Sequence, residues 1–293
     1  YEDDGTASDP GVCRVLTAGA GALSLGAAYT FESSYVEYVS VAALDSTHAV
    51  ACYRGGYSSA SYGYGLCKVL TVTGTTLTSG AEAQFYSSAY ARYVAVAALD
   101  AEHAVVCYQK DADSDRGACR LMYRSGASST ALSVGSEVLV GGTSTDELSV
   151  AALDAGSAAA CWRRSSQGRC ALVERSGASS LTVSAESVLS GSSVRYVSVA
   201  ALDSQAAVAC YRDDANGGAS TCGRLLRGSG GMSAPLGSLV VYPGSTTTHS
   251  VARLGPYAAV ACYDSSSDSV QCSVLSVAPA PPSPPPSPPP PSP

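Results

Sequence analysis

The sequence predicts an all-β fold: a β-propeller of about five four-stranded blades, with six blades as the alternative, followed by a polyproline II tail. Two observations lead to this prediction, a long internal repeat and a pair of cysteines at matching places in each repeat. The string Val-Ala-Ala-Leu-Asp recurs at Val41–Asp45, Val96–Asp100, Val150–Asp154 and Val199–Asp203, and a degenerate copy begins at Val251. The spacings of 55, 54, 49 and 52 residues are typical of propeller blades.

Each repeat contains four short apolar runs, which we name A to D. Run A carries the repeated string, and run B ends in a cysteine followed by an aromatic residue, as in Cys52-Tyr53. Run C carries the second cysteine, as in Leu66–Val72, and run D closes the unit, as in Thr76–Phe85. Both faces of run A consist of apolar or small residues, which predicts strands that are covered on both sides, as in stacked blades. No run has a helical period, so we expect almost no helix.

The number of blades depends on where a unit begins. Units that begin at run D give five D-A-B-C units from about residue 21 to residue 277, and one extra C-type run, Gly11–Thr17, precedes them. This surplus run leaves five and six blades open, and an uncapped strand edge could pair across protomers. The predicted domains are a propeller over residues 1–277, truncated in its first unit, and a tail over residues 278–293.

The composition excludes several classes of protein. The 293 residues carry a net charge of −7, and only two are lysines, which argues against nucleic acid as a partner because phosphate binding needs basic surfaces. No apolar stretch reaches the 18 residues that predict a membrane span. No cofactor is predicted, because the chain lacks phosphate-binding and catalytic sequence motifs.

Ten of the eleven cysteines fall into pairs at matching places in the repeat, one in run B and one in run C. The expected disulfides are Cys52 with Cys67, Cys107 with Cys119, Cys161 with Cys170, Cys210 with Cys222, and Cys262 with Cys272. Runs B and C are neighbours in an antiparallel blade, so the separation suits a disulfide. Such regular pairing predicts an oxidising, extracellular compartment. A zinc site is disfavoured, because no Cys-x-x-Cys is present.

Cys13 remains unpaired in this scheme. It matches Cys67 in its repeat position, so its partner is expected just before an aromatic residue, and Tyr1 is that residue. We therefore expect a further cysteine upstream of Tyr1. An intermolecular disulfide through Cys13 is the alternative.

Two groups of carboxylates have spacings that suggest chemistry. Asp45, Asp100, Asp154 and Asp203 match in the repeat and lie between runs A and B, where turn formation is favoured over glycosidase catalysis, because catalysis needs carboxylates in unlike environments. The weak calcium candidate is Asp111, Asp113 and Asp115, in the B–C loop of one unit. No twelfth-position glutamate follows them, so a solvated acidic loop is favoured and no metal site is predicted.

The composition changes abruptly after Val277. Residues 278–293 hold eleven of the fifteen prolines, interleaved with three serines. Proline has no amide hydrogen and a fixed φ, so this segment is expected to be a polyproline II rod rather than part of the sheet.

The run Ser283–Pro293 resembles the hydroxyproline-rich segments of plant and green-algal wall and surface glycoproteins, such as extensins and pherophorins. The repeat over Tyr38–Tyr53 is similar to β-propeller repeats of secreted algal proteins. The resemblance implies hydroxylated prolines, O-linked glycans, and a place in a cell wall, extracellular matrix or flagellar surface filament. The implied hydroxylation and glycosylation sites are Pro279, Pro281, Pro282, Ser283, Pro284, Pro285, Pro286, Ser287, Pro288, Pro289, Pro290, Pro291, Ser292 and Pro293.

These observations favour a non-enzymatic structural glycoprotein whose propeller assembles with itself or with other matrix or filament proteins. The alternative is a carbohydrate-binding, lectin-like propeller, because exposed members of the 18 tyrosines could stack on sugars. A glycosidase ranks third.

Overall fold

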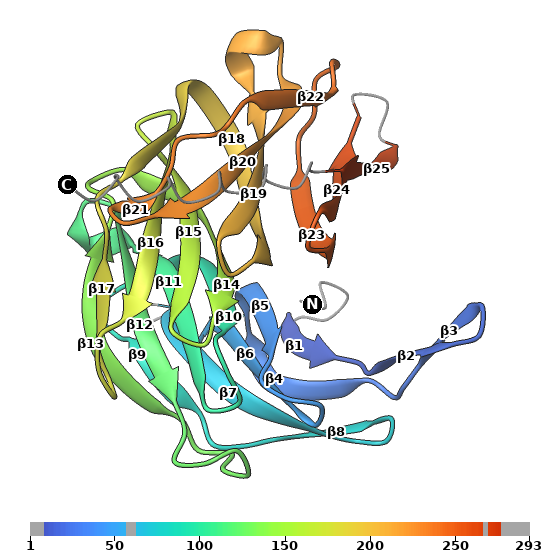
Figure 1. The fold of residues 1–293 in the computed structure, drawn as a ribbon. Coiled ribbons are helices and arrows are strands. Elements are labelled where there is room, and N and C mark those ends of the chain that lie inside the picture. The colour runs from blue at the N-terminus through green and yellow to red at the C-terminus, as the bar shows by residue number, and fades with distance from the viewer. Residues whose placement is uncertain (1–8, 57–62, 266–268, 277–293) are drawn as a thin grey trace, which may run out of the picture.

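The computed structural model describes residues 9–56, 63–265 and 269–276. Its strands form antiparallel sheets that radiate from a common axis, as blades do (Figure 1). The only helical segments among these residues are the single turns η1 (Asp111–Asp113) and η2 (Asp214–Asn216). The expectation of an all-β propeller with almost no helix is confirmed.

Four blades are complete. Blade 1 consists of β5 (Glu37–Ala43), β6 (His48–Gly55), β7 (Tyr64–Thr73), β8 (Thr76–Ser79) and β9 (Ala83–Tyr86). Blade 2 consists of β10 (Ala91–Ala98), β11 (His103–Lys110), β12 (Arg116–Tyr123) and β13 (Ser133–Val140). Blade 3 consists of β14 (Thr145–Asp154), β15 (Ser157–Arg164), β16 (Gln167–Arg175), β17 (Leu181–Val183) and the first half of β18 (Ser187–Asp203). Blade 4 consists of the second half of β18, β19 (Ala206–Asp213), β20 (Ala219–Gly228), β21 (Gly231–Met232) and β22 (Ser238–Tyr242).

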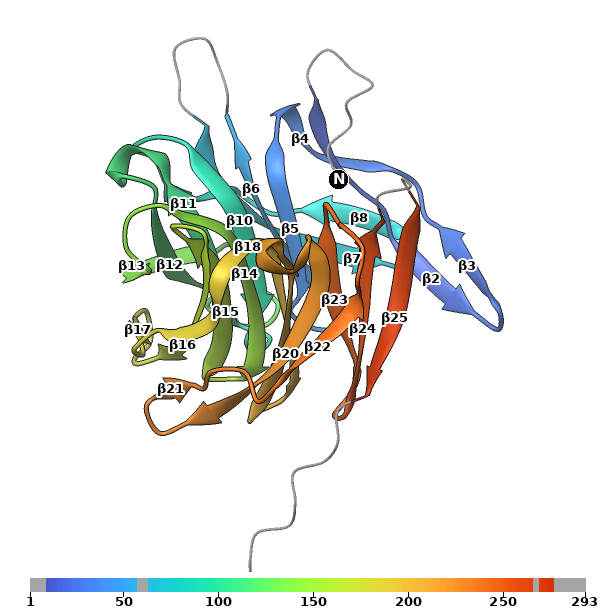
Figure 2. The ribbon, with the colours of Figure 1, turned by 90° about the horizontal axis from the view of Figure 1, so that it is seen from above.

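An incomplete sheet lies at each end of this array. The N-terminal half-blade pairs β1 (Pro10–Cys13) with β4 (Tyr29–Tyr35), which correspond to strands C and D, and between them β2 (Leu16–Gly19) and β3 (Ala22–Leu25) form a hairpin. Within the described part of the chain, the terminal blade contains strands A, B and C: β23 (His249–Gly255), β24 (Ala258–Asp264) and β25 (Val270–Ser276). Figure 2 shows β25 as the outermost strand of its blade.

The grouping of runs into D-A-B-C units is wrong. Each strand D pairs with the strand C that precedes it, as β13 does with β12 and β22 with β20, so a blade reads A-B-C-D along the chain. The strand β18 shows the reason, because it leaves blade 3 as strand D and enters blade 4 as strand A without a turn. The described strands do not close into a ring, and the number of blades stays a prediction.

The A strands line the axis, and each contacts the next, from β5 through β10, β14 and β18 to β23. A serine hydroxyl bridges successive A strands in three places, since Ser40, Ser149 and Ser198 accept hydrogen bonds from the amides of Val96, Val199 and Val251. The equivalent residue of blade 2 is Ala95, which has no hydroxyl.

The hydrophobic core is divided among the blade interfaces. One cluster joins blades 1 and 2 around Val50, Val69, Val106 and Met122, and similar clusters join the later blades in order. Each internal sheet is therefore packed on both faces, which explains the small and apolar residues on both sides of the A strands.

Candidate functional site

The ten paired cysteines form the five expected disulfides, each joining strand B to strand C of one sheet with Cα atoms 4.0–4.1 Å apart. The two cysteines of each pair lie directly opposite in the strand register, as Cys107 and Cys119 do. Five disulfides indicate an oxidising environment. No helix among the described residues is long and apolar enough to cross a membrane.

Cys13 forms no disulfide within the described part of the chain and is partly buried at the end of β1. Burial raises the pKa of its thiol. The upstream cysteine expected as its partner would lie outside the described residues, so the pairing of Cys13 stays a prediction. The tail sites from Pro279 to Pro293 also lie outside them.

The four repeated aspartates act as turn residues. In each A–B turn, the carboxylate accepts a hydrogen bond from the backbone amide two residues on, at 2.7–2.8 Å. His48 and His103 flank these turns, and each ring contacts the carboxylate of its own turn. The turn interpretation is confirmed.

Three of these carboxylates also form ion pairs that the sequence analysis missed. Asp45 pairs with Arg124 at 2.6 Å, Asp100 with Arg175 at 3.3 Å, and Asp154 with Arg227 at 2.7 Å. Each arginine lies near the end of strand C in the following blade, five residues after its cysteine, and this repeated position was the signal available in the sequence. Burial opposes ionisation of Asp45, but hydrogen bonds from Thr47, Arg124 and His48 outweigh it and hold the pKa well below its usual range.

The calcium candidates do not converge. Asp111 pairs with Arg92 at 3.1 Å, and Asp113 pairs with Lys110 at 3.2 Å. Burial raises the pKa of Asp115, and the nearby carboxylates of Asp111 and Asp146 raise it further. Across residues 9–56, 63–265 and 269–276, no group of three or more metal-binding side chains is found.

One end of the axis carries an aromatic and arginine cluster. The Arg54 guanidinium lies 5.2 Å from the centre of the Tyr38 ring and 5.1 Å from that of Tyr90, and Tyr38 packs on Tyr93 at 5.4 Å. Tyr38 and Tyr93 occupy the same bulge in strand A, with φ of 52° and 48°, which turns both side chains toward the neighbouring blade. Arg54 also pairs with Glu37, so its charge is already balanced.

The two ends of the blade array expose apolar side chains, and at the N-terminal end one of them stands at a position that is buried in every other unit. The residue three positions after the strand C cysteine is at most 5% exposed in five units. These residues are Leu70, Met122, Val173, Leu225 and Leu275. The sixth, Leu16 in the N-terminal hairpin, is 64% exposed. Leu23 and Leu25 of the same hairpin are 73% and 66% exposed, and Figures 1 and 2 show the hairpin extending away from the blades.

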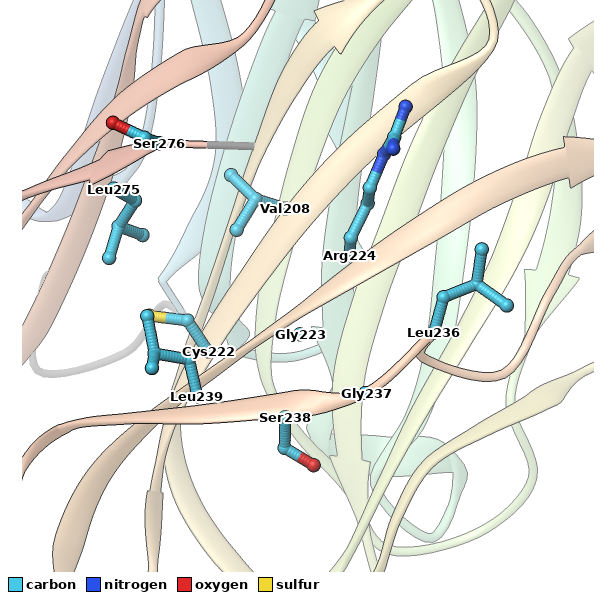
Figure 3. Close-up of a pocket in the computed structure, with 10 residues that line it drawn as sticks. All are labelled: Val208, Cys222, Gly223, Arg224, Leu236, Gly237, Ser238, Leu239, Leu275 and Ser276. Atoms are coloured by element: carbon cyan, nitrogen blue, oxygen red, sulfur yellow. The ribbon is translucent and has the colours of Figure 1, made fainter. Parts of the chain in front are cut away.

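At the other end, a pocket of about 380 Å³ opens between blade 4 and the terminal blade. We call it the terminal groove. Its apolar walls are Val208 of β19, Leu275 of β25, Leu239 of β22, and Leu236, which lies just before β22 (Figure 3). Leu236 and Leu239 are 61% and 57% exposed, and β25 pairs only with β24 among the described strands. An apolar groove beside an unpaired strand edge can bind an added strand.

No model of a known protein family matches the sequence, and no curated protein matches it significantly. Among solved structures, a protein from Lactobacillus plantarum is similar with a TM-score of 0.52 and 13% identity, over 87% of this chain and 74% of that one. The Dos1 propeller is similar with a TM-score of 0.46 and 10% identity, over 86% and 71%. A prolyl endopeptidase is similar with a TM-score of 0.48 and 14% identity, over 83% of this chain and 33% of that chain, so the present chain spans about a third of its length. The radial sheets show a β-propeller fold, and these likenesses do not indicate a function.

Proposed function

We propose that this chain is a non-enzymatic structural glycoprotein of an extracellular matrix or of a cell-surface or flagellar filament. The propeller serves as the assembly unit, and the proline-rich tail, hydroxylated and glycosylated, serves as a rod. One observation carries the proposal: both ends of the blade array expose apolar side chains, and one of them, Leu16, stands at a position that is buried in the five other units. Exposed apolar surfaces of this kind mark interaction sites, and the disulfides fit an extracellular place.

The repeated carboxylates give no support to a glycosidase. Asp45, Asp100 and Asp154 occupy the same turn and pair with equivalent arginines, so they lack the unlike environments that separate an acid from a base. These carboxylates accept hydrogen bonds from the backbone amides of their turns and from the arginines, so their interactions stabilise the fold. The variant Asp154→Asn tests this point. If the wild type hydrolyses a glycan and the folded variant does not, the proposal of a non-enzymatic protein is contradicted.

The test of the proposed function is intact-glycopeptide mass spectrometry of residues 277–293 from the native protein. We expect hydroxyproline that carries pentoses or hexoses. Bare, unhydroxylated proline in the secreted protein would make the tail a simple linker and would remove the glycoprotein part of the proposal.

A second candidate function is carbohydrate binding at the cluster around Arg54. Neighbouring tyrosine rings around an arginine that is paired with Glu37 present aromatic faces and polar edges together, and Tyr38 is 36% exposed. A glycan array with the wild type and with Tyr38→Ala distinguishes the two functions. Binding that is lost in Tyr38→Ala would favour the lectin-like function, and absence of binding would favour the structural one.

A further inference from the structure

The N-terminal hairpin has the form of a docking element. Its register pairs Leu16 with Leu25 and Ala18 with Leu23, so these four residues share one face. All eight residues of β2 and β3 are exposed, which shows that the hairpin is not packed against its own chain. A two-stranded hairpin in water is marginally stable unless its apolar face is covered. The apolar face of this hairpin therefore needs a partner surface.

The internal blades show what covers such a hairpin. In blades 3 and 4, strand C also turns back into a short strand, and the residue equivalent to Leu23 is Leu181 in β17 or Met232 in β21. Both side chains are buried, at 7% and 5% exposed. The strand β17 contacts β12 and β13 of blade 2, and β21 contacts β16 of blade 3. The hairpin of one blade therefore packs on strand C of the blade before it.

Among the residues that the structure describes, the terminal blade has no such hairpin. The corresponding position on blade 4 is strand C, β20, and there the terminal groove lies open, lined by Cys222, Gly223 and Arg224 of β20 together with the leucines of its walls. Gly223 stands where blades 1 and 2 have Lys68 and Arg120, so no long side chain fills the groove at this point. The sequence that follows β25 is rich in proline, which cannot supply the ladder hydrogen bonds of a returning strand.

We propose that the β2–β3 hairpin of one copy docks in the terminal groove of a second copy. Leu16, Leu23 and Leu25 pack against Leu236, Leu239 and Leu275, and the hairpin adds a strand to the free edge of β25. This contact repeats the blade-to-blade packing already present inside the chain, so its chemistry is that of an established interface. It rests on the proposed function and assigns the partner and the polarity of assembly.

The contact is head-to-tail, because the hairpin and the groove are different surfaces at opposite ends of the blade array. A heterologous contact of this kind generates either a ring or an open filament, depending on the rotation between copies. Each copy in the interior of such an assembly uses both surfaces, and each copy at an end leaves one of them free.

The experiment is a complementation test with two variants of the purified protein. Leu23→Asp breaks the hairpin and Leu239→Asp breaks the groove, and both positions are exposed, so the fold should tolerate the charge. By light scattering after size-exclusion chromatography, we expect the wild type to associate and each variant alone to be monomeric. An equimolar mixture should form dimers of twice the monomer mass, because the intact hairpin of one variant meets the intact groove of the other.

The matched control is Leu139→Asp, an exposed apolar residue on β13 of blade 2, which should associate as the wild type does. A wild type that stays monomeric, variants that associate normally, or a mixture that stays monomeric would each overturn the proposed contact. If Leu23→Asp unfolds on heating earlier than the wild type, Leu25→Ser replaces it. The two tests fail independently. If mass spectrometry finds a glycosylated tail but complementation fails, the proposed function stands and the contact is wrong. If the prolines are bare but complementation succeeds, the contact stands and the glycoprotein part of the function is wrong.

Discussion

Two regions of the molecule are built from the same repeat: the interface between blades 1 and 2, and the open end at blade 4. They differ in whether the turn aspartate forms an ion pair with an arginine of the next blade. In the first, Asp45 of the A–B turn meets the fully buried Arg124 of the next blade. In the second, the equivalent Asp203 accepts a turn hydrogen bond from the amide of Gln205 but forms no ion pair within the described residues. The residue five positions after Cys272, where blades 2, 3 and 4 carry arginine, is Val277. The comparison shows that a repeat unit is stabilised by the unit that follows it.

The ion pairs of the internal interfaces differ in burial, and this difference gives the prediction with the largest expected effect. The Arg124 side chain is 0% exposed and also donates to the carbonyls of Ala101 and Ser129, whereas that of Arg175 is 31% exposed. We expect Arg124→Ala to lower the free energy of unfolding by about 3–5 kcal/mol, because it breaks a buried ion pair and removes the guanidinium donor from two carbonyls. Arg175→Ala should cost about 0.2–1 kcal/mol. Urea denaturation measures both, and equal losses would show that the two interfaces are alike.

The disulfides provide the next test. Removing the Cys107–Cys119 bond with the double substitution Cys107→Ala and Cys119→Ala should lower the free energy of unfolding by roughly 3 kcal/mol, because a closed loop of this length restricts the unfolded chain. Cys13→Ser is the matched control, since Cys13 forms no disulfide among the described residues, and it should change stability little. Denaturation in guanidinium is the measurement. A large loss for Cys13→Ser would indicate that Cys13 is bonded.

Acid should act on the interface between blade 4 and the terminal blade before it acts on the one between blades 1 and 2. Burial lowers the pKa of His249 to about 4, and the Asp264 carboxylate opposes this only in part. Between the ordinary histidine pKa of about 6.5 and that value, the unfolded state binds more protons, so the free energy of unfolding decreases by up to about 3 kcal/mol as the pH falls through this window.

The carboxylate of Asp45 has the opposite chemistry and a lower window. Its folded pKa lies below the ordinary value, so its contribution is complete above that value and is lost as the pH falls through the folded pKa. Thermal unfolding from neutral to acidic pH should show two regions of loss. His249→Asn should remove the upper one and leave the lower one, and an unchanged profile would contradict the assignment.

The smallest expected effect comes from completing the serine bridges along the axis. Ala95→Ser would place a hydroxyl where Ser40, Ser149 and Ser198 accept hydrogen bonds from the next A strand. We expect a gain of about 1 kcal/mol in the free energy of unfolding, typical of one added hydrogen bond. Ala97→Ser, at a buried site two residues on, is the control, and it should destabilise because its hydroxyl has no equivalent partner.

Much of this architecture could be predicted because it is local and repeated. The B–C pairing of Cys107 with Cys119, the turn at Asp100 and the absence of helix follow from the alternation of residues and the spacing of the repeat. The assignment of strand D failed, because run D lies closer in the sequence to the next strand A than to the strand C that it pairs with, as β13 does between β12 and β14. The Asp45–Arg124 pair was missed because its members lie 79 residues apart.

The sequence by itself determined the β-propeller class, the five cysteine pairs and the turn role of the repeated aspartates. Each depends on residues that are close in the chain or identical in every repeat, so periodicity and turn chemistry suffice to predict them. Only the tertiary structure decided which sheet owns strand D, which arginine meets which aspartate, and which leucines stay exposed at the two ends. Those depend on which blade stands next to which, and the stabilisation comes from burial between surfaces that the linear sequence does not bring together.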